Sequence, residues 1–122
     1  MQMGEKRVLL VDDSKVSRSV IGQMVEALGH KVIGEAVNGL DGFEKYQALR
    51  PDVVLSDIEM PVLDGYGGLQ KIMEYDPEAW VVMITTVVNA QMINKILALG
   101  AQDVLKKPLK IEKLREKFDL LE

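Results

Sequence analysis

Five short runs of strand-forming residues alternate along the chain with stretches in which apolar residues recur at helical spacing. The runs lie at residues 8–11, 31–36, 53–57, 80–85 and 104–105, and the helical stretches at 16–28, 40–46, 69–73, 93–97 and 111–121. Strands that alternate with helices imply right-handed crossovers and a parallel sheet with helices on both faces. The sequence therefore predicts an α/β fold with a five-stranded parallel sheet and five helices.

Chain length and composition indicate one domain. The 122 residues suffice for a single hydrophobic core, so we expect one domain over residues 1–122, and 48% hydrophobic with 28% charged residues is typical of globular proteins. A net charge of −4 provides no basic field for nucleic acid, and no apolar segment has membrane-spanning length. Residues 1–7 lack the apolar core of a secretory signal, and cysteine is absent. We therefore expect a cytoplasmic protein that binds neither nucleic acid nor membrane directly.

Acidic residues stand where two of the predicted strands stop. Asp12 and Asp13 follow the first run, and Asp57 ends the third. The carboxyl ends of parallel strands share one edge of the sheet, where sites are built in wound α/β folds. Carboxylates ~4 Å apart repel by ~4 kcal/mol at an effective dielectric of ~20, and a divalent cation relieves this repulsion. Oxygen ligands favour Mg²⁺, for which Mn²⁺ can substitute.

A hydroxyl and an ammonium group complete the predicted site. Thr85 ends the fourth run, and Lys107 follows the fifth. The neighbouring Lys106 is a rival cation, but strand alternation turns it to the opposite face. Metal, hydroxyl and ammonium together suit a phosphoryl group, whose transfer depends mainly on positioning and charge neutralisation. Asp57 is then the candidate nucleophile, forming an aspartyl phosphate.

Each of these features also has an ordinary explanation. Asp13 or Ser14 could cap the first helix, Asp64-Gly65 could be a turn, and Lys107 could be a solvated surface charge. Capping of a helix, however, does not require a matching acid after the third strand, a hydroxyl after the fourth and a lysine after the fifth. The occurrence of all these residues at the strand ends favours a functional site.

The same residues resemble the receiver domains of bacterial response regulators, the CheY-like proteins of two-component signalling. The matching segments are Val8-Leu-Leu-Val-Asp-Asp-Ser14, Asp57-Ile-Glu-Met-Pro-Val-Leu-Asp-Gly65, Met83-Ile-Thr85 and Lys107-Pro108. The resemblance implies a flavodoxin-like, doubly wound sheet of order 2-1-3-4-5. It also implies a phosphorylation-dependent switch without independent substrate turnover. The expected partners are a sensor histidine kinase or histidine phosphotransfer protein, and a downstream output protein or domain bound by the fourth helix, fifth strand and fifth helix.

The resemblance further assigns roles to single residues. It implies Asp57 as phosphoacceptor, Asp13 and Asp57 as direct metal ligands, Asp12 as a mainly water-mediated ligand, the backbone carbonyl of Glu59 as another ligand, and Thr85 and Lys107 as the groups that hold the phosphoryl oxygens. The peptide bond between Lys107 and Pro108 is expected to be cis, as in the family.

Three positions depart from the family pattern. Val104 replaces the common aromatic residue three positions before the lysine, so an aromatic rotamer switch is not available there. Thr86 stands where a smaller residue is usual and narrows the approach to Asp57. Val87 offers no polar group to orient a hydrolytic water, which predicts slow loss of the phosphoryl group.

Other functional classes remain alternatives. A haloacid dehalogenase-like phosphohydrolase uses similar groups, but its acids are spaced Asp-x-Asp, whereas Asp12 and Asp13 are adjacent. A flavodoxin-like cofactor binder needs a phosphate loop that the adjacent acids would repel. A pseudo-receiver that only docks to partners remains compatible with Val104 and Thr86. The sequence fits a free-standing receiver and the receiver of a longer regulator equally well.

Overall fold

The computed structural model describes residues 4–121 and contains five strands and five helices in alternation. The elements are β1 (Arg7–Val11), α1 (Lys15–Ala27), β2 (Lys31–Ala36), α2 (Gly39–Leu49), β3 (Val53–Asp57), α3 (Gly65–Tyr75), β4 (Val81–Thr85), α4 (Ala90–Ala98), β5 (Asp103–Lys106) and α5 (Ile111–Asp119). All strand pairs are parallel, in the order β2-β1-β3-β4-β5. The predicted fold class and strand order are confirmed. Within the described residues, no helix has both the length and the apolarity needed to cross a bilayer.

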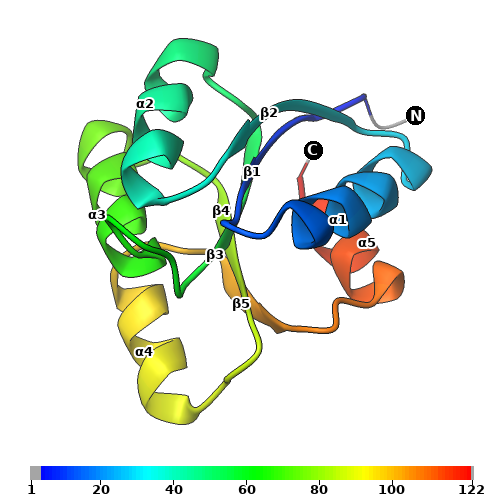
Figure 1. The fold of residues 1–122 in the computed structure, drawn as a ribbon. Coiled ribbons are helices and arrows are strands. Elements are labelled where there is room, and N and C mark those ends of the chain that lie inside the picture. The colour runs from blue at the N-terminus through cyan, green and yellow to red at the C-terminus, as the bar shows by residue number, and fades with distance from the viewer. Residues whose placement is uncertain (1–3, 122) are drawn as a thin grey trace.

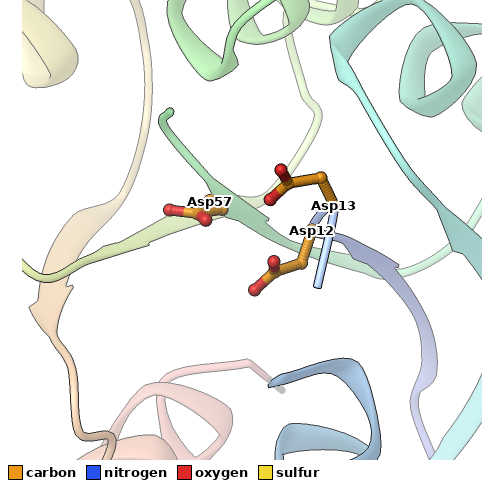
Figure 2. A group of neighbouring side chains, drawn as sticks. All are labelled: Asp12, Asp13 and Asp57. Atoms are coloured by element: carbon orange, nitrogen blue, oxygen red, sulfur yellow. The ribbon is translucent and has the colours of Figure 1, made fainter. Parts of the chain in front are cut away.

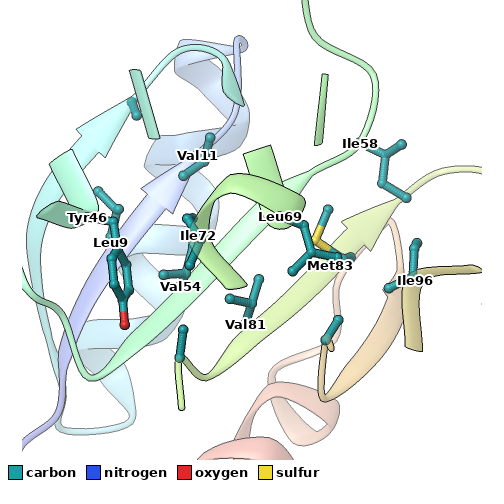
Figure 3. Packing of buried hydrophobic residues seen from close by; sticks show 13 residues of the cluster. Leu9, Val11, Tyr46, Val54, Ile58, Leu69, Ile72, Val81, Met83 and Ile96 are labelled. Atoms are coloured by element: carbon teal, nitrogen blue, oxygen red, sulfur yellow. The ribbon is translucent and has the colours of Figure 1, made fainter. Parts of the chain in front are cut away.

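The helices form a layer on each face of the sheet. Figure 1 shows α1 and α5 on one side, and α2, α3 and α4 on the other. Because successive side chains of a strand point to opposite faces, Leu9 of β1 belongs to the core beneath the three-helix layer, while Val8 belongs to the other core. Figure 3 shows the first of these cores. Full burial of such a side chain contributes roughly 1.5–3 kcal/mol, so both faces stabilise the sheet.

The register of the strands brings their carboxyl ends to one edge. Val11 of β1 pairs with Ser56 of β3, so the residue after each of them stands at the same level. Asp57 in turn pairs with Ile84 of β4, directly before Thr85. The chemistry-bearing residues therefore emerge from three neighbouring strands at a common level.

Four helices begin with a polar cap. The side chains of Ser14, Asn38, Asp64 and Asn89 each accept a hydrogen bond from the backbone N–H three residues later. Such a cap contributes typically ~1 kcal/mol. Asn38-Gly39 is a typical turn sequence, but here Asn38 is the cap of α2 and Gly39 its first helical residue. A Cβ on Gly39 would lie 2.4 Å from the carbonyl oxygen of Asp64, so this glycine allows α2 and the start of α3 to approach closely.

Parts of two predicted apolar stripes do not face the core. Val16 and Val20 of α1 are exposed, and Val16 retains 74% of its accessible surface. The buried face of α1 is centred on Ile21 and Val25, and Val20 lies about 100° around the helix from Ile21. Leu40, the first residue of the predicted helical stretch 40–46, lies in the first turn of α2 and is 38% exposed.

Candidate functional site

Three carboxylates converge at the carboxyl edge of the sheet. Asp12 and Asp13 directly follow β1, and Asp57 is the last residue of β3. Each offers an oxygen within 4.8 Å of the others. Figure 2 shows the three side chains gathered at the ends of the strands. Asp12 is buried, Asp57 is partly buried and Asp13 is exposed. The predicted convergence of the acids is confirmed.

Asp12 is held by the start of α1. Its Oδ1 accepts the backbone N–H of Ser14 at 2.9 Å, and its Oδ2 accepts the hydroxyl of Ser17 at 2.6 Å. The Arg18 guanidinium donates to the backbone carbonyl of Asp12 at 2.7 Å. Burial raises the pKa of Asp12, but hydrogen bonds from Ser17, Lys107 and Ser14 outweigh it, so this pKa lies below its ordinary value. The carboxylate is therefore anionic and fixed in orientation.

Asp57 is less firmly held. Its Oδ1 accepts the backbone N–H of Ile58 at 2.7 Å, and its Oδ2 lies 3.4 Å from the ammonium nitrogen of Lys107. Burial raises the pKa of Asp57 above its ordinary value, although the Ile58 hydrogen bond and the Lys107 charge oppose the rise. The nearby charge of Asp12 adds to it. Because few hydrogen-bond donors contact the Asp57 carboxylate and its pKa is raised, its oxygens keep lone pairs that can form a new bond.

Lys107 reaches the acids from the edge strand. It directly follows β5, and its Nζ lies 2.9 Å from Asp12 Oδ2, while Lys106 is exposed. As expected from strand alternation, Lys107 and not Lys106 reaches the acids, and its role at the phosphoryl group stays a prediction. The expected cis peptide bond before Pro108 is present. Burial lowers the pKa of Lys107, but hydrogen bonds and charge from Asp12 and Asp57 more than compensate and raise it. The ammonium group is thus fully charged at neutral pH.

The remaining predicted residues lie around this edge. Thr85 is 2% exposed, its hydroxyl accepts the backbone N–H of Val87 at 3.4 Å, and its carbonyl accepts that of Lys107 at 2.7 Å. Glu59 is exposed in the loop after β3, and the role of its carbonyl stays a prediction. Val104 is partly buried and packs against the core beneath α2, α3 and α4.

Sequence reasoning missed the two α1 residues that hold Asp12. Ser17 and Arg18 lie in the first turns of α1, five and six positions after the aspartate. Their contacts depend on the rotation of α1 about its axis. The only signal in the sequence is Ser17 itself, a hydroxyl one turn after the Ser14 cap.

The donor set fits a hard divalent cation. The cluster supplies carboxylate oxygens, and histidine and cysteine are absent from the metal-ligating groups found among residues 4–121. Three carboxylates and the single ammonium of Lys107 leave a net local charge of −2. Oxygen-only ligation and this net negative charge match Mg²⁺ or Mn²⁺.

Comparison with known proteins agrees with this geometry. Residues 8–119 match the response regulator receiver domain family. The chemotaxis protein CheY of Treponema pallidum is 43% identical over 92% of this chain and 79% of its own length.

Two solved structures have the same fold. A chain of the CheX-CheY-BeF3-Mg+2 complex from Borrelia burgdorferi superposes with a TM-score of 0.90 at 32% identity, covering 94% of this chain and 87% of its own. The response regulator domain of Thermotoga maritima CheB gives 0.84 at 33% identity, covering 96% and 92%. The chain belongs to the receiver domains of response regulators, the CheY- and CheB-type signalling domains of two-component systems.

Proposed function

We propose that Asp57 of this receiver accepts a phosphoryl group from a phosphohistidine. The observation that supports this most directly is that the Asp57 carboxylate belongs to the acid cluster and also lies near Lys107, with its Oδ2 3.4 Å from the ammonium nitrogen. An Asp57 oxygen forms the new P–O bond, the P–N bond breaks, and the imidazole of the donor keeps the electron pair. The donor is a sensor histidine kinase or a histidine phosphotransfer protein.

The neighbouring residues have distinct roles in this proposal. Asp13 and Asp57 would hold Mg²⁺ directly, Asp12 would hold it mainly through water, and the Glu59 carbonyl would supply a further ligand. Mg²⁺ supplies charge neutralisation at the phosphoryl oxygens. Lys107 and the Thr85 hydroxyl bind those oxygens once the phosphoryl group is on Asp57, since both groups lie at the same sheet edge. The modification adds about −1.5 to −2 charges, which draws the ammonium towards it.

The chain acts as a phosphoacceptor and does not turn over free substrates. Asp12 and Asp13 are adjacent at the end of β1, whereas haloacid dehalogenase-like phosphohydrolases space these acids by one residue. The site also lies at an open sheet edge, where Asp13 is exposed. Such an edge suits docking of a donor protein. We further propose that residues 1–122 act as one receiver domain in the cytoplasm.

The output surface is proposed to be α4, β5 and α5. A groove of about 570 Å³ runs along β5 and α5 and reaches Lys107, so it connects the phosphorylation site with the surface. Five lysines line it against two acids: Lys106, Lys107, Lys110, Lys113 and Lys117, with Asp103 and Glu116. Two pairs are neutralised within the groove, because the ammonium of Lys117 lies 2.6 Å from Asp103 and that of Lys113 lies 4.0 Å from Glu116. Since Lys107 faces Asp12 and Asp57, the excess is carried by Lys106 and Lys110. The remaining excess of positive charge supports binding of a protein partner through a segment with acidic residues. We propose no direct contact with nucleic acid or membrane.

Mass spectrometry of the intact protein tests the chemistry. Incubation with a small phosphodonor such as phosphoramidate and Mg²⁺ should add the mass of one phosphoryl group. The gain should disappear in Asp57→Asn and when EDTA removes the metal. Glu44→Gln removes an exposed acid on α2 and should leave the gain intact. Modification of Asp57→Asn, or no modification of the wild type, contradicts the proposal, and the second result favours a pseudo-receiver.

A further inference from the structure

One oxygen of Asp12 accepts two side-chain donors from opposite sides of the site. The hydroxyl of Ser17 donates to Oδ2 at 2.6 Å, and the ammonium of Lys107 donates to the same atom at 2.9 Å. The other oxygen accepts the backbone N–H of Ser14 at 2.9 Å. Asp12 is only 3% exposed, so bulk water has little access to replace a lost donor, and any water between Asp12 and Mg²⁺ would come with the metal. Leaving such a buried carboxylate oxygen without a partner is costly.

The two donors differ in how firmly they are mounted. Ser17 lies in the first turn of α1, and its own backbone N–H is capped by the Ser14 side chain at 3.2 Å. Lys107 reaches Asp12 at the end of a long flexible side chain from the residue after β5, and the same ammonium already lies near Asp57. The serine is therefore the fixed donor, and the lysine is the movable one.

A phosphoryl group on Asp57 would compete for the movable donor. A phosphoryl group carries about −1.5 to −2 charges, whereas a carboxylate carries one and that of Asp12 already has two other hydrogen bonds, so the phosphoryl group attracts the ammonium more strongly. When Lys107 turns to them, Asp12 Oδ2 retains a side-chain donor only if Ser17 is present. The resting protein does not depend on Ser17 in the same way, because Lys107 still occupies Oδ2.

We infer that Ser17 is a positioning residue that keeps Asp12 hydrogen-bonded and oriented while Lys107 moves from Asp12 to the phosphoryl group. The inference rests on the proposed function of Asp57 and Lys107. It adds a role for the hydroxyl of α1 in the phosphorylated state. Ser17 touches neither the phosphoryl group nor the metal in this role and acts through Asp12.

The effect of Ser17 is measurable as binding of beryllofluoride, a mimic of the phosphoryl group, in the presence of Mg²⁺. Ser17→Ala should weaken this binding by about tenfold, the fold-change that ~1.4 kcal/mol produces. Ser17→Thr retains the hydroxyl and should restore it. Ser19→Ala removes an exposed hydroxyl from the same helix that makes no side-chain hydrogen bond within residues 4–121, and should bind as the wild type does.

Two further measurements separate this role from a general structural one. Urea unfolding without Mg²⁺ and beryllofluoride should show Ser17→Ala close to the wild type, because alanine is a better helix former and Lys107 still pairs with Asp12. The ¹⁵N resonance of the Lys107 ammonium should shift on beryllofluoride addition in the wild type and shift less in Ser17→Ala. The inference is overturned if Ser17→Ala binds beryllofluoride as tightly as the wild type, or if Ser17→Thr does not rescue. Absence of binding by the wild type would instead count against the proposed function.

Discussion

Replacing Asp13 by asparagine should stabilise the protein when divalent cations are absent. Asp13 is exposed, and its carboxylate has an oxygen within 4.8 Å of oxygens of both Asp12 and Asp57. It makes no ion pair among residues 4–121, since Lys107 contacts only the other two acids. The wild-type side chain thus adds repulsion at the site without a compensating contact.

The size of the gain follows from the separation of the charges. Two unit charges 4.8 Å apart repel by roughly 0.9 kcal/mol at a dielectric of ~80 and by roughly 3.5 kcal/mol at ~20. The exposure of Asp13 favours the lower figure, and the positive charge of Lys107 reduces it further. An acid near the start of α1 also gains ~0.3–1 kcal/mol from the helix dipole, which the substitution loses. Repulsion from two neighbours leaves a net stabilisation of about 1 kcal/mol.

Urea unfolding at pH 7.5 and low salt, with and without Mg²⁺, measures this balance. At a Mg²⁺ concentration of ~100 times its Kd the wild type should gain ~2.7 kcal/mol. Asp13→Asn should gain much less, because it lacks one proposed ligand, so the order of stability reverses. Glu44→Gln changes the net charge equally and should match the wild type in both conditions. The reasoning is refuted if Asp13→Asn is less stable than the wild type without metal. It is also refuted if Mg²⁺ raises the free energy of unfolding of both proteins equally.

Three further predictions concern other parts of the molecule. Val87→Glu should speed loss of the Asp57 phosphoryl group by about tenfold, measured by intact mass over time, because the valine cannot orient water. A positioned general base contributes ~10²–10⁴-fold, and a side chain at this 51% exposed position should supply only part of that. An unchanged rate would contradict this. Tyr46→Phe should cost about 1 kcal/mol at pH 7, since the Tyr46 hydroxyl donates to Asp76 at 2.6 Å. That hydrogen bond lowers the pKa of Asp76, so its contribution is complete above pH 3.8 and should fade as the pH falls below that value, in urea unfolding across pH. Gly29→Ala should cost about 1–2 kcal/mol in the same assay, because φ at this position is +89°; a neutral result would show that the backbone relaxes.

The acid cluster could be predicted from the sequence because its causes are local. A strand buried on both faces forms a nearly continuous apolar run, as residues 8–11 and 53–55 do, so the acids that follow these runs mark the strand ends. Strand order is a non-local property, and the order 2-1-3-4-5 followed from family resemblance. Once that order is known, the register of β3 and β4 places Thr85 beside the end of β3.

Features that depend on how elements pack could not be predicted in this way. Helical spacing places Val20 with the apolar residues of α1, but the helix is oriented by Ile21 and Val25, and Val20 faces solvent. The same rotation brings Ser17 onto Asp12, so the hydrogen bond and the exposed valine have one cause. Neither is visible in apolar periodicity, which does not specify the angle at which a helix meets its sheet.

The anions and the cation of the site are attached to parts of the sheet with different mechanical support. Asp12 directly follows β1 and Asp57 ends β3, and each of these strands is hydrogen-bonded to a strand on both sides. Lys107 follows β5, which has only β4 as a neighbour. A shift of the lysine backbone disturbs one ladder, but a shift of either acid disturbs two. The backbone that carries the two acids is therefore stiff, and the backbone that carries Lys107 is compliant. Movement that follows the addition of charge is directed to the edge of the sheet at β5.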